Sequence, residues 1–207
     1  MYSSQSIQAY LGQLASADPV PGGGSVAALS GALGASLVAM VCRLTIDKKG
    51  YESVSTEMQT ILARAEALQK ELGILIQTDS LAFLRVKDAF KLPKETEVEK
   101  STRTEAIQDA YKSASQVPLR VAQLCALVLE LARPVAEKGN KNAASDAGVG
   151  ALMAEAGLRG AAFNVTINLA AIKDEAFINM HHLRVAELIA DAEQHKLEIL
   201  NIVEGRL

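Results

Sequence analysis

Two aspartates interrupt segments that otherwise consist mostly of small or apolar residues. Asp79 lies in a long stretch with apolar residues at helical spacing, one turn before Phe83. Asp146 belongs to Gly139–Gly148, which crowds amide, ammonium, hydroxyl and carboxylate groups into one turn. Carboxylates in apolar surroundings can act as general acids or bases and can stabilise a cation. The simpler alternatives are a solvent-facing Asp79 and a helix cap formed by Asp146 or Ser145.

Two amide side chains and a glycine-rich turn offer further polar groups. Asn164 and Asn168 are four residues apart, on one face of an otherwise apolar helical segment, so if buried they need hydrogen-bond partners. Those partners are a ligand, the other amide or the backbone. Gly22–Gly24 precede a predicted helix start, where free backbone N–H groups favour an anion such as a carboxylate. The alternative is a tight turn that lets two helices approach closely.

Several common catalytic motifs are absent from the sequence. It contains no H-E-x-x-H motif and no Cys/His cluster, so no metal site is expected. Signatures of P-loops, dinucleotide-binding folds and serine hydrolases are missing as well. Cys42 and Cys125 lie in apolar stretches without redox or ligand spacing, which predicts buried free thiols in a reducing cytoplasm.

The composition excludes other classes of protein. The 207 residues are 49% hydrophobic with a formal net charge of −3, so we expect one sizeable core and no nucleic-acid binding. Residues 1–15 lack the basic and apolar segments of an export signal, which predicts a cytoplasmic protein. Pro19–Cys42 is uncharged, but its Ala, Gly and Ser content and its lack of aromatic anchors favour a buried helix over a membrane span.

Helices alone are expected to position these polar residues. Val, Ile and Thr form no alternating runs bounded by turns, so no strand is predicted. The predicted helices span residues 4–15, 25–46, 53–90, 96–138, 143–169 and 174–204. Pro118 predicts a kink or local break, and Gly50 a left-handed cap after the second helix. We therefore predict a single all-α domain over residues 1–207, built as a bundle of long antiparallel helices.

The length of two predicted helices bears on assembly. Helices approaching 40 residues are about 60 Å long, whereas a compact domain of this size is about 35 Å across. Helices that overhang the core carry apolar faces that need another subunit. A homodimer that associates through helical faces is therefore expected.

Six motifs in a fixed order identify a family resemblance. They are Pro21–Ser25, Lys48–Tyr51, Asp79–Phe83, Leu92–Lys94, Gly139–Asp146 and Asn164–Leu169. Together they resemble the cyclodeaminase domain of formiminotransferase-cyclodeaminase and its stand-alone bacterial relatives, which include methenyltetrahydrofolate cyclohydrolases. The resemblance covers about residues 4–204, and the formiminotransferase domain of the bifunctional proteins has no counterpart in the sequence.

The resemblance implies an all-helical homodimer with a folate site among the helices near the subunit interface. The first expectation is formiminotetrahydrofolate cyclodeaminase activity, in which N10 attacks the amidine carbon, ammonia leaves and 5,10-methenyl-tetrahydrofolate forms. The alternative is a cyclohydrolase, in which water opens the methenyl compound to 10-formyl-tetrahydrofolate. Neither reaction needs a metal, or a cofactor beyond the tetrahydrofolate substrate. A further alternative is a non-catalytic helical dimer that binds a metabolite.

The resemblance also implies roles for individual residues. Asp79 and Asp146 are the expected carboxylates, one beside the cationic centre and one moving protons. Lys48, which is hard to separate from Lys49, is the expected acid or else a charge that tunes one of the carboxylates. The expected substrate-binding residues are Gly23, Gly24, Ser25, Phe83, Asn140, Asn142, Ser145, Asn164 and Asn168.

Overall fold

Every regular element in the computed structural model, which describes residues 2–207, is helical. The α-helices are α1 (Ile7–Leu14), α2 (Gly23–Arg43), α3 (Ser55–Phe90), α4 (Glu97–Lys138), α5 (Ala144–Leu169) and α6 (Glu175–Glu204). Short 3₁₀ turns span Tyr2–Ser4, Glu52–Val54 and Lys141–Ala143. Among the described residues there is no strand, which confirms the all-α prediction.

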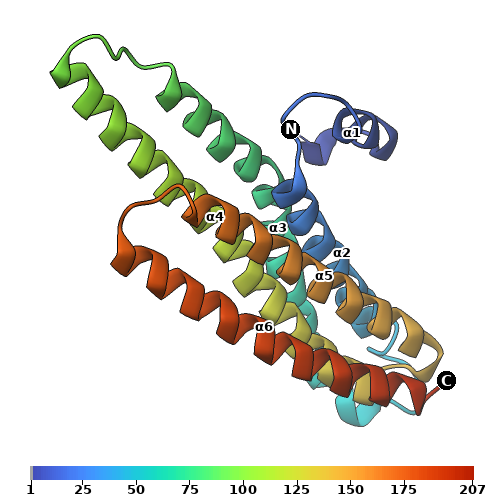
Figure 1. Ribbon diagram of the computed structural model, residues 1–207. Coiled ribbons are helices and arrows are strands. Elements are labelled where there is room, and N and C mark those ends of the chain that lie inside the picture. Colours follow the sequence, from blue (N-terminus) through green and yellow to red (C-terminus); the bar gives the residue numbers. More distant parts are fainter. Residues whose placement is uncertain (1) are drawn as a thin grey trace.

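The helices form an elongated bundle in which α2 to α6 pack along one another (Figure 1). The ends of α3 and α4 project beyond the other helices as a hairpin, and α1 stands apart from the bundle. A capping box at Thr96 starts α4, since its hydroxyl accepts from the Glu99 N–H and the Glu99 carboxylate accepts in return. The core that holds the bundle together is built largely from alanine, valine and leucine.

Pro118 does not break α4, which runs unbroken from Glu97 to Lys138. Proline has no N–H, so the carbonyl of Ala114, four residues earlier, loses its helical partner. The Nδ2 of Asn168 on α5 donates to that carbonyl at 3.0 Å. A side chain from a neighbouring helix thus replaces the missing hydrogen bond, and the predicted local break is wrong.

Helix α2 ends at Arg43, three residues before the predicted end. The side chain of Thr45 caps the end of the helix. Its hydroxyl donates to the Val41 carbonyl and accepts a hydrogen bond from the backbone N–H of Asn140 at 2.8 Å. The left-handed conformation next along the chain belongs to Asp47, with φ of 57°, whereas Gly50, with φ of 91°, lies further on in the connecting turn. Gly50 is therefore not the cap of this helix.

Glycine and alanine line the contact between α2 and α5, which run antiparallel. A methyl group on Gly34 would lie 2.7 Å from the Gly150 carbonyl oxygen, and one on Gly157 would lie 2.8 Å from the Ala27 oxygen. The two backbones therefore touch directly, and this small-residue seam fixes how the helices slide against each other. Within the described chain, α2 alone is long and apolar enough to cross a membrane, and most of it is buried inside the bundle.

Candidate active site

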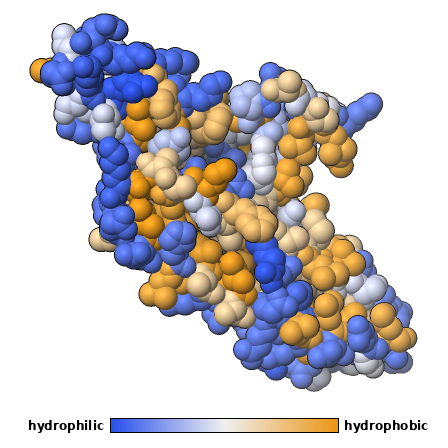
Figure 2. Space-filling model, in the orientation of Figure 1, coloured by the Kyte–Doolittle hydropathy of each residue, from blue (hydrophilic) through white to orange (hydrophobic). Residues whose placement is uncertain are grey.

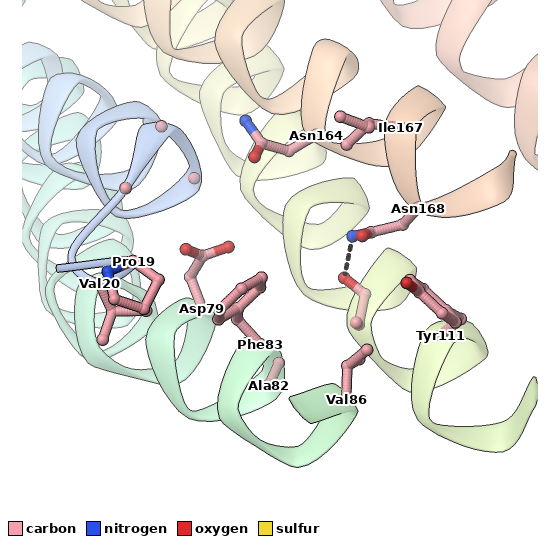
Figure 3. Close-up of a pocket in the computed structure, with 14 residues that line it drawn as sticks. Pro19, Val20, Asp79, Ala82, Phe83, Val86, Tyr111, Asn164, Ile167 and Asn168 are labelled. Carbon is pink, nitrogen blue, oxygen red and sulfur yellow. Dashed lines mark hydrogen bonds between the residues drawn. The ribbon is translucent and has the colours of Figure 1, made fainter. Parts of the chain in front are cut away.

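A cavity of about 350 Å³ opens where the start of α2 meets α3, α4 and α5 (Figure 3). Its lining comprises Pro19, Val20, Gly22, Gly23, Gly24, Asp79, Ala82, Phe83, Val86, Tyr111, Ala114, Asn164, Ile167 and Asn168. Six of the residues predicted for the site are therefore brought together here, namely Gly23, Gly24, Asp79, Phe83, Asn164 and Asn168. A volume near the lower end of the usual range for ligand sites suits a small aromatic ring system.

Asp79 projects from α3 toward the first turn of α2 (Figure 3). The backbone N–H of Ser25 in this turn favours the charged form of its carboxylate, and the absence of a side chain at Gly24 leaves room for it. A methyl group on Gly24 would lie 2.1 Å from a carboxylate oxygen of Asp79. The glycines thus let a carboxylate dock against a helix N-terminus, where free N–H groups favour negative charge.

The electrostatic setting of Asp79 favours a positively charged ligand. Burial raises the pKa of this carboxyl above its ordinary value of 3.8, and the Ser25 N–H offsets only part of the rise. Among the described residues no cation forms an ion pair with Asp79. A half-buried carboxylate without a counter-ion is stabilised when a cation enters the cavity.

The side-chain nitrogens of the two amides on α5 each donate a hydrogen bond to a backbone carbonyl. Asn164 Nδ2 donates to the Gly160 carbonyl at 2.8 Å, and Asn168 Nδ2 donates to the Ala114 carbonyl at 3.0 Å. They do not pair with each other. In the described chain neither amide oxygen has a hydrogen-bond donor, so both oxygens can accept from N–H groups of a ligand.

Aromatic side chains form two walls of the cavity, and one of them was not predicted. Phe83 comes from α3, with 41% of its surface exposed, and Tyr111 comes from α4. Tyr111 packs edge-on against Phe90, with ring centroids 6.3 Å apart. Its only signal in the sequence is that it is the single aromatic residue in Glu97–Lys138.

Ser25 lies behind the cavity rather than in its lining. It is fully buried, and its hydroxyl is 3.0 Å from the hydroxyl of Tyr10 on α1. Its contribution to the cavity is its backbone N–H, which favours the charged form of Asp79.

The other predicted residues gather at the opposite end of α2. This second group comprises Lys48, Asn140, Asn142, Ser145 and Asp146. Helix α2 has 21 residues and is therefore about 30 Å long. Within one chain the structure does not bring Asp79 and Asp146 together.

Asn140 organises the second group. Its Oδ1 accepts from Lys48 Nζ at 2.8 Å and from the Asn142 N–H at 3.1 Å, and its Nδ2 donates to the Leu44 carbonyl. Lys48 is half-buried in this contact, whereas Lys49 is exposed, so the structure separates the two lysines. Asp146 is half-buried, in the first turn of α5.

Neither end of the molecule offers a set of metal ligands. In residues 2–207 no three His, Cys, Asp or Glu side chains are close enough to hold a metal ion. Burial raises the pKa of both Cys42 and Cys125 to about 12, so these thiols are poor nucleophiles.

Comparison with known proteins shows which family and which relatives the chain is similar to. Residues 6–187 match the profile of the family described as formiminotransferase-cyclodeaminase. The chain is 44% identical to a methenyltetrahydrofolate cyclohydrolase of Methylorubrum extorquens, over 207 residues that cover 100% of both proteins. It is 33% identical to the formimidoyltransferase-cyclodeaminase of Rattus norvegicus, over 97% of this chain but 37% of that protein. A crystal structure of formiminotetrahydrofolate cyclodeaminase from Thermotoga maritima superposes with a TM-score of 0.89 at 32% identity, covering 99% and 98% of the two chains.

Proposed function

The chain belongs to the formiminotransferase-cyclodeaminase family, and on that premise we propose that it is a folate enzyme acting on the amidine carbon of a tetrahydrofolate derivative. The cyclohydrolase reaction, the alternative in the sequence analysis, is the form that we favour. Its support is the 44% identity to a methenyltetrahydrofolate cyclohydrolase over the full length of both chains. The predicted cyclodeaminase activity is the second candidate, supported by the similarity to the Thermotoga maritima structure.

The observation that carries the proposal is the half-buried Asp79 carboxylate that has no cation beside it among the described residues. The methenyl group of 5,10-methenyl-tetrahydrofolate is a delocalised cation between N5 and N10. Placed against Asp79, it supplies the missing counter-charge, and the carboxylate stabilises the ring at the position where charge changes during the reaction. An uncharged substrate would not gain this interaction.

We infer that Asp79 also moves the protons of the reaction. As water adds to the methenyl carbon, a carboxylate accepts one of its protons. The bond from this carbon to N5 then breaks, its electron pair stays on N5, and the proton held by the carboxylate is delivered there. The hydroxyl on the carbon loses its own proton to solvent as the formyl C=O bond forms. The product is 10-formyl-tetrahydrofolate, with one proton released overall. No further cofactor enters these steps.

The remaining cavity residues fit the pterin ring. Phe83 and Tyr111 provide flat apolar surfaces, and the amide oxygens of Asn164 and Asn168 accept from ring N–H groups. In the cyclodeaminase reaction the same carboxylate would assist the departure of ammonia after N10 attacks. The geometry of the cavity therefore serves either reaction, and the identity to the cyclohydrolase decides our preference.

One absorbance experiment separates the alternatives. Purified protein is incubated with 5,10-methenyl-tetrahydrofolate and, separately, with 5-formimino-tetrahydrofolate, with the Asp79→Asn variant as the control. Consumption of the methenyl chromophore by the wild type alone supports the cyclohydrolase. Its formation with release of ammonia supports the cyclodeaminase. No reaction with either compound contradicts the enzymatic proposal and favours the non-catalytic binding protein.

A homodimer would explain why five of the twelve predicted residues lie far from the cavity. The outer faces of α2 and α5 carry exposed apolar side chains, among them Leu33, Leu152, Phe163 and Ile167, and the last two are 74% and 71% exposed. This face extends from the cavity, which Ile167 also lines, toward the second group. Figure 2 shows apolar side chains gathered across the middle of the molecule, whereas the α3–α4 tip is mostly hydrophilic.

We propose that a second copy of the chain packs against this face. A two-fold axis through its middle, perpendicular to the helices, places the second group of one protomer beside the cavity of the other. Asp146 and Lys48 would then face Asp79 across the interface, as the predicted two-carboxylate site requires. Each dimer would hold two such sites.

Mixing inactive variants tests the shared site. Asp79→Asn and Asp146→Asn are each expected to be inactive alone. After subunit exchange, half of the dimers are mixed and each contains one intact site, so about a quarter of wild-type activity returns. Full activity of Asp146→Asn, or no recovery on mixing, contradicts the shared site.

The interface itself is tested separately. Leu33→Glu combined with Leu152→Glu should give a monomer without activity in sedimentation and turnover measurements. Leu197→Glu, at an exposed position of α6, is the matched control and should remain dimeric. A fully active monomer would refute the proposed assembly.

A further inference from the structure

Helix α1 places one buried side chain, Tyr10, against the rest of the molecule. It has 8 residues and stands apart from the bundle (Figure 1). Ile7 and Leu11 on this helix are 80% and 54% exposed, whereas Tyr10 is 6% exposed. A helix that leaves its apolar residues in solvent gains little from hydrophobic burial. Tyr10 is therefore the buried contact of α1 with the bundle, and the half-buried Leu14 at the end of the helix adds a second, weaker one.

The hydroxyl of Tyr10 reaches the residue that holds Asp79. It lies 3.0 Å from the hydroxyl of Ser25, and both side chains are buried. The backbone N–H of the same Ser25 lowers the pKa of the Asp79 carboxyl, which lies against the first turn of α2. A hydrogen bond from Tyr10 to Ser25 thus links α1 to the first turn of α2, against which the Asp79 carboxylate lies.

The segment before α1 attaches this arrangement to α3 as well. The backbone N–H of Tyr2 donates to Gln77 Oε1 at 3.2 Å, two residues before Asp79. The Tyr2 ring packs edge-on against Tyr10, with centroids 5.8 Å apart. Tyr10 is therefore held from two sides, and its hydroxyl has a defined position relative to both α2 and α3.

We propose that Tyr10 is a positioning residue for the catalytic carboxylate, acting through Ser25 and not through contact with the substrate. The Tyr10–Ser25 bond fixes the first turn of α2, so that the Ser25 N–H points at Asp79. The inference rests on the proposed function, because it assigns Tyr10 to the reaction that Asp79 performs. It also assigns a catalytic role to the N-terminal segment, which packs only weakly against the bundle.

The surroundings of Asp79 leave few other groups able to change its protonation. The titratable residues near it on other elements of the described chain are Tyr10 on α1 and Tyr111 across the cavity on α4. Neither α2 nor α5 adds a titratable side chain to the cavity lining in the described chain. Burial raises the pKa of Tyr10 and the Asp79 charge adds to the rise, so this phenol stays neutral and can donate at working pH.

The test is Tyr10→Phe, which removes the hydroxyl and keeps the ring. The Ser25 N–H then loses its fixed direction, the carboxylate form of Asp79 is less favoured, and its pKa rises. Since the carboxylate is the active form, the acidic limb of the profile of kcat/KM against pH should move upward by about half a unit to one unit. Ser25→Ala should give the same shift, and the double variant no more than either single variant.

A second measurement does not depend on turnover. The protein is labelled with carbon-13 at its aspartates, and the Asp79→Asn variant identifies the carboxyl resonance of Asp79. This resonance should titrate at higher pH in Tyr10→Phe than in wild type. Thr60→Val removes an exposed hydroxyl that bonds within its own helix and is the control, with neither readout changed.

The outcomes are distinct. An upward shift of both the pH profile and the Asp79 titration in Tyr10→Phe supports the proposal. A variant that is less active at every pH, with an unmoved limb and titration, shows a structural role only and overturns it. If the wild type turns over neither folate, the proposed function fails, and the carboxyl titration still decides whether Tyr10 positions Asp79.

Discussion

The close contact between Gly24 and Asp79 makes Gly24→Ala a direct test of the active-site geometry. The new methyl group would lie 2.1 Å from one carboxylate oxygen and 2.5 Å from the carboxyl carbon, whereas ordinary contacts begin at 3.4 Å. The oxygen must therefore retreat by about 1.3 Å, which is 3.4 minus 2.1. An aspartate side chain can rotate by this amount, so the fold should survive.

The functional cost should be much larger than the structural cost. A misplacement of about 1 Å at a reacting group costs about 100-fold in rate. We therefore expect kcat/KM of Gly24→Ala for 5,10-methenyl-tetrahydrofolate to fall about 100-fold. The midpoint of thermal unfolding should change little, because alanine also raises helix propensity at this position.

Gly73→Ala is the matched control. Gly73 lies on α3, the helix that carries Asp79, and a methyl group there would meet nothing within 4 Å. It should keep wild-type activity and unfold at the same or a slightly higher temperature. Wild-type kcat/KM in Gly24→Ala, with a folded protein, would show that the position of Asp79 against α2 is irrelevant and would refute the reasoning.

Other substitutions probe the charge and packing around the same cavity. Because burial raises the pKa of Asp79, its charge makes the folded state less stable as pH rises above the ordinary value of 3.8. At pH 7, Asp79→Asn should therefore unfold at the same or a higher temperature than wild type, and this difference should disappear below pH 3.8. Its turnover should fall at least about 100-fold. Asn168→Ala leaves the Ala114 carbonyl without a donor and should cost about 1–3 kcal/mol in urea unfolding. In a Pro118→Ala background the restored N–H takes over that carbonyl, so the same substitution should cost clearly less; an equal cost would contradict the compensation. Gly34→Ala brings a methyl group to 2.7 Å from a backbone oxygen of α5 and should lower stability by about 1–3 kcal/mol, and an unchanged melting temperature would argue against the seam.

The helices were predictable because their apolar residues recur at helical spacing over long stretches. Residues 53–90 were predicted as one helix, and α3 spans Ser55–Phe90. The end of α2 was not predictable in the same way. It depends on a hydrogen bond between Thr45 and Asn140, which are 95 residues apart in the sequence.

The cavity was predictable only in part. Asp79 stood out because a carboxylate is unusual on an apolar helical face, and Asn164 and Asn168 for the same reason. Tyr10 and Tyr111 did not stand out, since an aromatic residue at helical spacing is typical of a core. The separation between Lys48 and Gly24 was already implicit in the prediction, because they flank one helix of about 20 residues.

The glycine seam between α2 and α5 fixes the distance between the two ends of this helix pair. Since backbone contacts hold the two helices in register, the spacing from the cavity to the second group depends on helix length alone, at about 1.5 Å per residue. Adding one turn to both helices would keep the fold and the seam but would offset the facing groups of the proposed dimer by about 5.4 Å. Among active relatives, the number of residues between Gly24 and Lys48 should therefore vary less than the residues themselves, and gaps should gather in the α3–α4 tip.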